Sequence, residues 1–353
     1  MRTALRLPRP AALALAGALL AGCGSRAGTG GGLSGAVRVD GSSTVFPLAE
    51  AVAEEFNRGV APRARVTVGQ SGTGGGFTRF ARGETDVSTA SRPIKPSEAE
   101  EAEAAGVPFV ELPIAFDGIA IVTGRENTWA ECLTVEELAR IWAPGSEIDS
   151  WAQVRPGFPD RPLRLFGPGT DSGTYDYFTQ AINGEEGASR TDFNASEDDN
   201  VLVQGVSGDP NALAYFGLAY YENNRSRLKL IAVDDGDDQN GAGCIEPTAE
   251  TVRAGQYQPL ARPEFIYVRQ ASLSEPTVRA FAEYFLANAA QLAREPQVGA
   301  VPLSDEAYRL GVEKLRRGVT GSIFADGRSP VGMSMNDLLG LASAPAADTT
   351  ASR

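Results

Sequence analysis

The chain has 353 residues, which is long enough for two domains, and a formal net charge of −13. Its composition of 42% hydrophobic and 22% charged residues is typical of soluble globular proteins. It contains no histidine, which excludes a Ser-His-Asp or Cys-His catalytic group and a His-ligated zinc or haem. The acidic balance and the lack of any run of basic residues argue against nucleic-acid binding, because affinity for a phosphate backbone depends on clustered Lys and Arg.

The N-terminal segment has the pattern of a bacterial export signal. Residues 1–22 contain three arginines and then an apolar run at 11–20, which is too short to span a bilayer as a stable helix. Leu20-Ala21-Gly22-Cys23 resembles the lipobox of bacterial lipoproteins, in which the cysteine is acylated and becomes the first residue. We therefore expect a lipid on Cys23, a flexible linker up to residue 35, and anchoring at the outside of a bacterial membrane, in the periplasm or at the cell surface. A plain secretory signal is the alternative.

Two cysteines remain once Cys23 carries lipid. In an oxidising compartment outside the membrane, Cys132 and Cys244 are expected to form a structural disulfide. Two buried free thiols are the alternative, because the sequence does not give the distance between them.

From residue 36 onwards, short β-branched runs alternate with polar turns and helical patterns. Strands are predicted at 37–40, 66–68 and 85–88, followed by helices at 48–56, 77–82 and 97–105. This repetition predicts an α/β sheet with right-handed crossovers, in which ligands bind at the carboxyl ends of the strands.

A longer apolar segment at 108–122 is predicted to be extended and to lead into a second lobe. The alternation continues there with helices at 134–142 and 175–182, strands at 163–166 and 228–233, a loop with an acidic helix at 195–206 and an aromatic-rich segment at 212–221. A strand at 265–268 is expected to return to the first lobe, where helices at 276–288 and 305–317 pack. Residues 319–353 are expected to form a disordered tail, because their final stretch of small residues cannot bury a core.

Three strand-to-helix turns are rich in Ser, Thr and Gly: Gly41-Ser42-Ser43-Thr44, Ser71-Gly72-Thr73-Gly74-Gly75-Gly76 and Asp171-Ser172-Gly173-Thr174. Each places backbone N–H groups and hydroxyl donors at the positive end of a helix, which suits an anion. Ordinary helix caps are the alternative for any one turn. The middle turn fits neither nucleotide motif, because Phe77 stands where a P-loop requires Lys and where the dinucleotide fingerprint requires Gly.

These turns belong to seven ordered motifs that resemble the phosphate-binding proteins of Pst-type ABC importers over residues 36–318. The motifs are Gly41-Ser42-Ser43-Thr44-Val45-Phe46-Pro47, Ser71-Gly72-Thr73-Gly74-Gly75-Gly76-Phe77, Ala90-Ser91-Arg92-Pro93-Ile94-Lys95, Phe116-Asp117-Gly118-Ile119-Ala120, Gly167-Pro168-Gly169-Thr170-Asp171-Ser172-Gly173-Thr174, Ser196-Glu197-Asp198-Asp199-Asn200 and Ala214-Tyr215-Phe216-Gly217. The resemblance implies a type II periplasmic-binding-protein fold, with two α/β lobes joined by two crossing strands around one phosphate ion. We expect lobe 1 at 36–121 plus 262–318 and lobe 2 at 122–261.

The same resemblance implies a function in transport. Such a protein captures inorganic phosphate and delivers it to the membrane subunits of an ABC permease, without enzymatic activity, cofactor or metal. We expect a monomer that contacts the membrane only through its lipid anchor.

The resemblance also implies three sets of phosphate ligands: Ser43, Thr44 and Val45; Ser71, Thr73 and Gly74; and, in lobe 2, Ser172, Gly173 and Thr174. The family's usual aspartate in the third lobe 1 turn is replaced by Arg92, and the arginine that usually precedes the Ser-Gly-Thr turn is missing. We therefore expect Arg92 to be the cationic anchor, and Asp117 or Asp171 to accept the phosphate proton. The alternatives are a surface ion pair of Arg92 with Glu98 or Asp86, and a turn or hinge role for Asp117.

Discrimination between phosphate and sulfate depends on that acceptor, because sulfate carries no proton at neutral pH and a carboxylate repels it. A same-fold binding protein for sulfate, molybdate or tungstate is therefore an alternative, as is a phosphate sensor or adhesin. An exported phosphatase or hydrolase with Ser43, Ser71 or Ser172 as nucleophile is a further alternative. None of these serines lies in a Ser-x-x-Lys pattern, and the chain has no His to act as the base.

Overall fold

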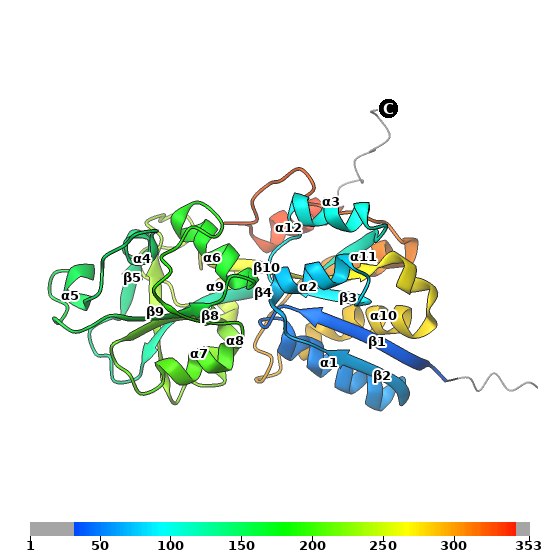
Figure 1. The fold of residues 1–353 in the computed structure, drawn as a ribbon, viewed down its shortest axis with the longest axis horizontal. Helices are drawn as coiled ribbons and strands as arrows, with labels where there is room; N and C mark the ends of the chain where they lie inside the picture. The colour runs from blue at the N-terminus through cyan, green and yellow to red at the C-terminus, as the bar shows by residue number, and fades with distance from the viewer. Residues whose placement is uncertain (1–31, 344–353) are drawn as a thin grey trace, which may run out of the picture. The chain divides into compact units, whose positions relative to one another are not determined.

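The computed structural model describes residues 32–343 (Figure 1). The predicted export signal, Cys23 and most of the predicted linker lie outside the described residues, as do residues 344–353. Within the described range, no helix combines the length and the apolar character needed to cross a membrane.

The first section of the sheet contains the first three predicted strands. β1 (Ser34–Gly41) lies between β2 (Arg63–Val68) and β3 (Val87–Ala90) and is parallel to both. β3 pairs with the antiparallel β10 (Ala261–Arg269), which pairs in turn with the first part of β4 (Phe109–Gly124). The short β11 (Val301–Pro302) also pairs with β4. We call this section, with the helices packed on it, lobe 1.

The second section begins where β4 leaves β10. Residues 119–124 of β4 pair with two antiparallel strands, β8 (Ala212–Gly217) and β9 (Leu228–Asp234). The remaining strands are β6 (Arg164–Pro168), parallel to β8 and to β7 (Asn194–Ser196), and β5 (Cys132–Thr134), parallel to β9. We call this section lobe 2. The chain enters it through β4 and returns through β10, so the predicted α/β fold with two connecting strands is confirmed.

Helices follow the strands in the predicted order. Those of lobe 1 are α1 (Phe46–Gly59), α2 (Gly72–Ala81), α3 (Pro96–Ala104), the 3₁₀ turn at Gln270–Ser274, α10 (Pro276–Leu292) and α11 (Asp305–Arg317). Those of lobe 2 are α4 (Val135–Trp142), α5 (Trp151–Val154), α6 (Gly173–Asn183), α7 (Asp199–Val206), α8 (Leu218–Glu222) and α9 (Ala249–Arg253). In α1 the buried residues Leu48, Val52 and Phe56 recur every four positions, so one helix face packs on the core.

Helix α2 begins earlier than the sequence predicts. The run of glycines from Gly72 to Gly76 reads as a turn before a helix at 77, yet these residues form the first turns of α2. Tight packing explains the glycines, because a Cβ on Gly76 would lie 2.6 Å from Gly41 Cα, and one on Gly72 would lie 2.5 Å from the Asp171 carbonyl oxygen. Close approach to β1 and to lobe 2 thus outweighs the low helix propensity of glycine.

The C-terminal segment differs from the expected disordered tail up to residue 343. The buried Glu111 of β4 accepts hydrogen bonds from Ser322 Oγ at 2.5 Å and Ile323 N at 2.8 Å. Phe324 packs edge-on against Phe265, with 5.8 Å between ring centroids. The chain ends its described part in α12 (Met335–Ser343). A buried carboxylate and a few apolar side chains therefore hold this segment on lobe 1.

Lobe 2 contains the predicted disulfide. Cys132, in β5, is bonded to Cys244, which follows β9, and their Cα atoms are 6.0 Å apart. The bond joins two segments that are also neighbours through the pairing of β5 with β9.

Candidate functional site

Helix α1 begins just after the first predicted turn, and α2 and α6 begin within the other two. Their N-termini present backbone N–H groups that the helix itself does not bond. Ser172 caps α6, because its Oγ accepts a hydrogen bond from Thr174 N at 3.1 Å. Val45 and Ser71, at the N-caps of α1 and α2, make no side-chain cap. The ordinary-cap alternative therefore describes one of the three turns.

The three turns meet where lobe 1 contacts lobe 2. Thr44 Oγ1 and Thr174 Oγ1 are 3.0 Å apart and share a hydrogen bond, and Gly74 N donates to the Asp171 carbonyl at 2.9 Å. A Cβ on Gly173 would lie 2.5 Å from Thr73 Oγ1, so this turn requires glycine for its contact with α2. Residues far apart in sequence thus place their hydroxyls and N–H groups around one point.

Ser71 and Val45, which are predicted ligands, form hydrogen bonds within lobe 1. Ser71 donates from both its N and its Oγ to Asp40 Oδ1, at 3.1 and 2.9 Å. Val45 N donates to Ser42 Oγ at 3.4 Å. Both residues still border the turns, but their hydrogen bonds stabilise the turns themselves.

Arg262 is a buried cation that lies outside the seven sequence motifs. It lies on β10, and its Nη2 donates to Thr174 Oγ1 at 2.8 Å and to Thr44 Oγ1 at 3.1 Å. Nη2 and Nε also donate to Asp117 Oδ2, at 2.9 and 3.2 Å. Nη1 has no hydrogen-bond partner among the residues that the structure describes. Arg262 therefore joins a turn of each lobe while one of its nitrogens stays unpaired.

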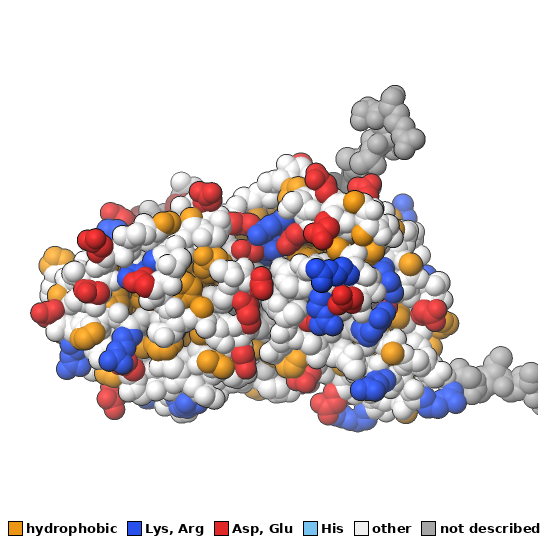
Figure 2. Space-filling model, in the orientation of Figure 1, with side chains coloured by type: hydrophobic (Ala, Val, Ile, Leu, Met, Phe, Trp, Pro, Cys, Tyr) orange, Lys and Arg blue, Asp and Glu red, His pale blue; other side chains and the backbone are white. Residues whose placement is uncertain are grey.

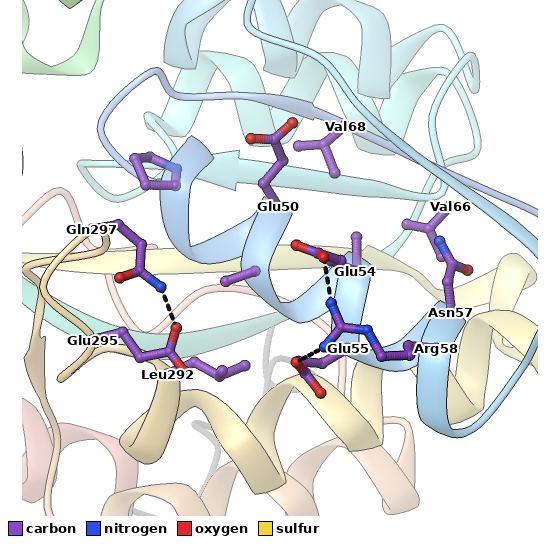
Figure 3. Close-up of a pocket in the computed structure, with 13 residues that line it drawn as sticks. Glu50, Glu54, Glu55, Asn57, Arg58, Val66, Val68, Leu292, Glu295 and Gln297 are labelled. Carbon is purple, nitrogen blue, oxygen red and sulfur yellow. Dashed lines mark hydrogen bonds and ion pairs between the residues drawn. The ribbon is translucent and has the colours of Figure 1, made fainter.

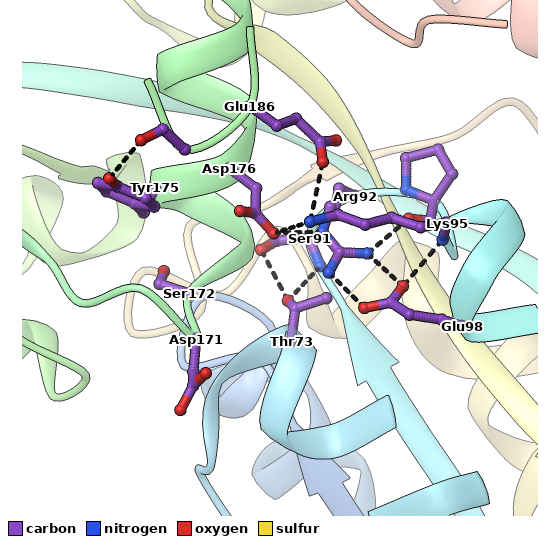
Figure 4. Close-up of polar contacts among 12 residues, drawn as sticks. Thr73, Ser91, Arg92, Lys95, Glu98, Asp171, Ser172, Tyr175, Asp176 and Glu186 are labelled. Atoms are coloured by element: carbon purple, nitrogen blue, oxygen red, sulfur yellow. Dashed lines mark hydrogen bonds and ion pairs between the residues drawn. The ribbon is translucent and has the colours of Figure 1, made fainter. Parts of the chain in front are cut away.

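Asp117 supports Arg262 from the other connecting strand, β4. Its Oδ1 accepts a hydrogen bond from Leu218 N, at the start of α8, at 3.2 Å. Burial raises the pKa of Asp117, and the charge of Arg262 opposes that shift. Both oxygens are thus engaged, which agrees with the hinge alternative for Asp117. Asp171, the other predicted acceptor, is exposed, and its carboxylate points away from Arg92 in Figure 4.

Arg92 is buried in an ion network between the lobes (Figure 4). Its Nη1 and Nη2 donate to Glu98 of α3 at 2.8 and 2.7 Å, and its Nε donates to Asp176 of α6 at 2.8 Å. Burial lowers the pKa of Arg92, but the two carboxylates more than offset this and raise it above its usual value. Lys95 Nζ extends the network to Asp176 at 3.0 Å and to Glu186 at 2.8 Å.

This network decides between the sequence-based alternatives for the partners of Arg92. The pair with Glu98 exists, but it joins a buried Arg92 to a partly buried Glu98 and is not an exposed surface pair, whereas Asp86 pairs with Arg38 and Arg269. A Cβ on Gly74 would lie 3.9 Å from Arg92 Nη2, so the guanidinium also borders the second turn.

Asp199 is a second buried group that the sequence analysis did not single out, although it lies within one of the seven motifs. It is the first residue of α7, and its Oδ2 accepts a hydrogen bond from Ser43 Oγ at 3.5 Å. Its Oδ1 has no partner among residues 32–343. Burial raises the pKa of Asp199 to about 7, although the charge of Arg262 opposes the shift.

A separate groove of about 720 Å³ lies on lobe 1, between α1 and α10 (Figure 3). Its lining includes four glutamates, Glu50, Glu54, Glu55 and Glu295, and one cation, Arg58, which is bonded to Glu54 and Glu55. Repulsion by these carboxylates makes the groove unsuitable for an anion, so it is not a competing site for the turns.

Comparisons with known proteins show the family to which the chain belongs. Residues 27–289 match the family model of the PBP superfamily domain. Protein SphX of Synechococcus elongatus is 47% identical over 305 residues, which cover 86% of this chain and 88% of SphX. The phosphate-binding protein PstS of Staphylococcus haemolyticus is 33% identical over 311 residues, which cover 86% of this chain and 94% of PstS.

Solved structures show the same fold. The crystal structure of a "possible phosphate binding protein" from Planctomyces limnophilus has a TM-score of 0.60 and 45% sequence identity, and the match covers 81% of this chain and 99% of that one. An ABC-type phosphate transport receptor from Vibrio cholerae has a TM-score of 0.56 at 22% identity, with 75% and 99% covered, and supports the fold alone.

Proposed function

We propose that this chain, which belongs to the PBP superfamily and is a PstS-like phosphate-binding protein, captures inorganic phosphate between its lobes and delivers it to an ABC importer. Its relatives are substrate-binding transport proteins, and the catalytic alternative has no support from them. The other same-fold alternatives, binding of sulfate, molybdate or tungstate and a sensor or adhesin role, also have no relative among those compared above.

The observation that carries the proposal is the position of Arg262. A buried guanidinium donates to Thr44 of lobe 1 and to Thr174 of lobe 2, beside the N-termini of three helices. Such an arrangement offers an oxyanion a full positive charge, hydroxyl donors and helix dipoles from both lobes. An ion bound there stabilises the contact between the lobes, because it bonds to both of them at once.

The proposed ligands are the predicted turn residues together with Arg262. Ser43 and Thr44 contribute from the first turn, Thr73 and Gly74 from the second, and Ser172, Gly173 and Thr174 from lobe 2. Val45 and Ser71 act through the turns that they hold in place, and Arg92 adds charge beside the second turn. Each hydrogen bond to a charged oxygen contributes about 1.5–3 kcal/mol, so six or more of them support affinity of about 1 μM or tighter.

Attraction at long range does not explain anion binding here. Figure 2 shows acidic side chains along the line where the two lobes meet on that face. The chain is also acidic as a whole, with a net charge of −13. The favourable interactions must therefore come from nearby dipoles, hydroxyls and buried arginine.

The last part of the proposal concerns the location of the protein in the cell. A lipid on Cys23 would hold the protein, as a monomer, at the outer face of a bacterial membrane, next to the permease subunits that receive the ion. Replacing Cys23 by Ala should release the exported protein from the membrane fraction, and retention of the variant there would contradict the lipid anchor.

Calorimetric titration of the purified protein with phosphate and with sulfate tests the function. We expect heat and saturation with phosphate at micromolar concentrations and much weaker binding of sulfate. Absence of phosphate binding, or tighter binding of sulfate, would overturn the assignment. Turnover of a chromogenic phosphate ester would favour the catalytic alternative.

A further inference from the structure

Arg262 and Asp199 both bond hydroxyls of the first turn, and each keeps one buried polar atom without a partner among the described residues, one a donor and the other an acceptor. Arg262 Nη1 is the donor, and Asp199 Oδ1 is the acceptor. Both side chains are fully buried, and they adjoin the first turn, where Arg262 bonds Thr44 and Asp199 bonds Ser43. Buried polar atoms are rarely left unpaired, because each costs about 1–3 kcal/mol. This pair therefore indicates a ligand that can both accept and donate.

We propose that Asp199 determines the specificity of the site by accepting the proton of a protonated tetrahedral oxyanion, such as phosphate or arsenate, and by excluding unprotonated sulfate. This inference rests on the proposed binding of an oxyanion between the lobes. Phosphate at neutral pH offers oxygens to Arg262 and a hydroxyl to Asp199. Sulfate offers only oxygens, which an ionised carboxylate repels.

The other carboxylates near the turns fit this role less well. Asp117 is engaged by Arg262 and Leu218, and Asp171 is exposed. Glu197 lies beside the second turn, since a Cβ on Gly72 would be 2.9 Å from its Oε2, and its Oε1 accepts from Asp171 N at 3.2 Å. Its Oε2 also has no partner among the described residues, but the side chain is only partly buried. Asp199 alone among these four is fully buried, bonded to a proposed ligand and left with a free oxygen.

The charge of Asp199 gives the specificity a pH dependence. Because burial raises the pKa of Asp199 to about 7, the group is an acceptor above that pH and a donor below it. Arg262 favours its ionised form, whereas Asp117 of β4 and the adjacent Glu197 and Asp198 disfavour that form. As a neutral acid, Asp199 can donate to sulfate, so rejection of sulfate should weaken in acid. Tyr220 of α8 also faces the group, but burial keeps this phenol protonated over the whole range.

Glu264 needs separate control because it titrates nearby. It lies on β10 two residues from Arg262, and burial raises its pKa to about 8. A pH effect that arises from Asp199 must disappear in Asp199→Asn and persist in Glu264→Gln.

Sulfate is the best probe, since it has no proton of its own to titrate between about pH 5.5 and about pH 8.5. In the unmodified protein, we expect calorimetry to show sulfate binding at least about tenfold tighter at the acidic end. In Asp199→Asn, sulfate should bind equally at both ends, and phosphate at the alkaline end should bind at least about tenfold more weakly. The control Asp198→Asn removes the same charge from an exposed neighbouring position, so sulfate should still bind more tightly in acid. The transition should lie at a slightly lower pH, because Asp198 disfavours the ionised form of Asp199.

Two results would overturn the inference. The first is a sulfate affinity in the unmodified protein that does not change with pH, which needs no variant to fold. The second is an Asp199→Asn protein that still binds phosphate with full affinity and rejects sulfate. If the unmodified protein binds neither ion, the proposed function itself fails, and this result is distinct from both of the others.

Discussion

Two arginines are buried where the lobes meet, and the protein neutralises them in different ways. Arg92 donates from all three of its nitrogens, to Glu98 of lobe 1 and Asp176 of lobe 2 and to its neighbour's carbonyl. Arg262 has one carboxylate partner, Asp117, and keeps Nη1 unpaired within the described residues. The first arginine is therefore suited to holding the lobes together, and the second to binding an anion.

Residue type and burial do not distinguish the two arginines. Both are Arg, both are nearly inaccessible, and each reaches groups of both lobes. Only the partners differ, since Arg92 has two carboxylates and Arg262 has one carboxylate and two hydroxyls. A guanidinium whose charge is already matched gains less from an incoming anion than one whose donors are partly free.

The largest expected effect is that of Arg262→Ala. Phosphate affinity should fall at least about 100-fold, because the variant loses the charge and the bonds that join Thr44 and Thr174. Arg262→Lys keeps a positive charge for Asp117 and protects the fold, but it lacks the planar fork and should also bind weakly. Calorimetric titration with phosphate measures both.

Arg269→Ala is the matched control for this prediction. Arg269 is the last residue of the same strand and pairs with Asp86. Neither residue belongs to one of the three turns or bonds to one of them. It should retain phosphate affinity within about twofold. If Arg262→Ala and Arg269→Ala bind phosphate equally well, Arg262 does not bind the ion.

Arg92→Ala should have a smaller effect on affinity, about tenfold, and a larger one on stability. Removing one partner of a buried ion pair costs about 3–5 kcal/mol, and here the buried Asp176 keeps only Lys95 as an ion-pair partner while the partly buried Glu98 loses its pair. Calorimetry and thermal unfolding of the same preparation separate the two effects. A loss of affinity greater than that of Arg262→Ala would reverse the comparison and restore Arg92 as the main anion ligand.

Asp176→Asn tests the contact between the lobes alone. It weakens the bonds from Arg92 and Lys95 to lobe 2 and leaves the pair of Arg92 with Glu98 intact. We expect phosphate to bind about threefold more weakly, mainly through faster release in stopped-flow measurements. Asp192→Asn alters the ion pair of an exposed aspartate with the buried Arg190 in the same lobe, and should leave the release rate unchanged. Equal release rates in the two variants would show that the network does not hold the closed lobes.

The sequence predicts much of the fold because its patterns are local. Strands, turns and helices alternate within a few residues, and Ser, Thr and Gly mark the three turns before any tertiary contact is known. The roles of the arginines could not be predicted in this way. Arg262 is 218 residues from Thr44, and it precedes the strand pattern recognised at 265–268. Asp199 reads as an ordinary acidic residue at a helix start, because its burial depends on the packing of the lobes.

Glu264→Gln should have the smallest effect on phosphate binding and a clear effect on stability. The pKa of Glu264 is raised from 4.5 to about 8, so between these values the folded protein keeps a proton that the unfolded chain loses. The contribution of Glu264 to the free energy of unfolding therefore falls as the pH rises through this window and levels off above it. Gln carries no charge, so the advantage of the variant over the parent should grow with pH and reach a few kcal/mol near the upper end.

Thermal unfolding of the two ligand-free proteins across that pH range measures the difference in stability between variant and parent. Asp199 is present in both proteins, so its contribution cancels in this difference. Unfolding temperatures that stay parallel would show that Glu264 ionises normally.

Phosphate affinity of Glu264→Gln provides the sharper test of the contrast between the two arginines, because Glu264 is two residues from Arg262 on the same strand. If Glu264→Gln alters that affinity, Arg262 is held by two carboxylates, as Arg92 is, and the contrast between the two arginines must then come from their hydroxyl partners rather than from their charge.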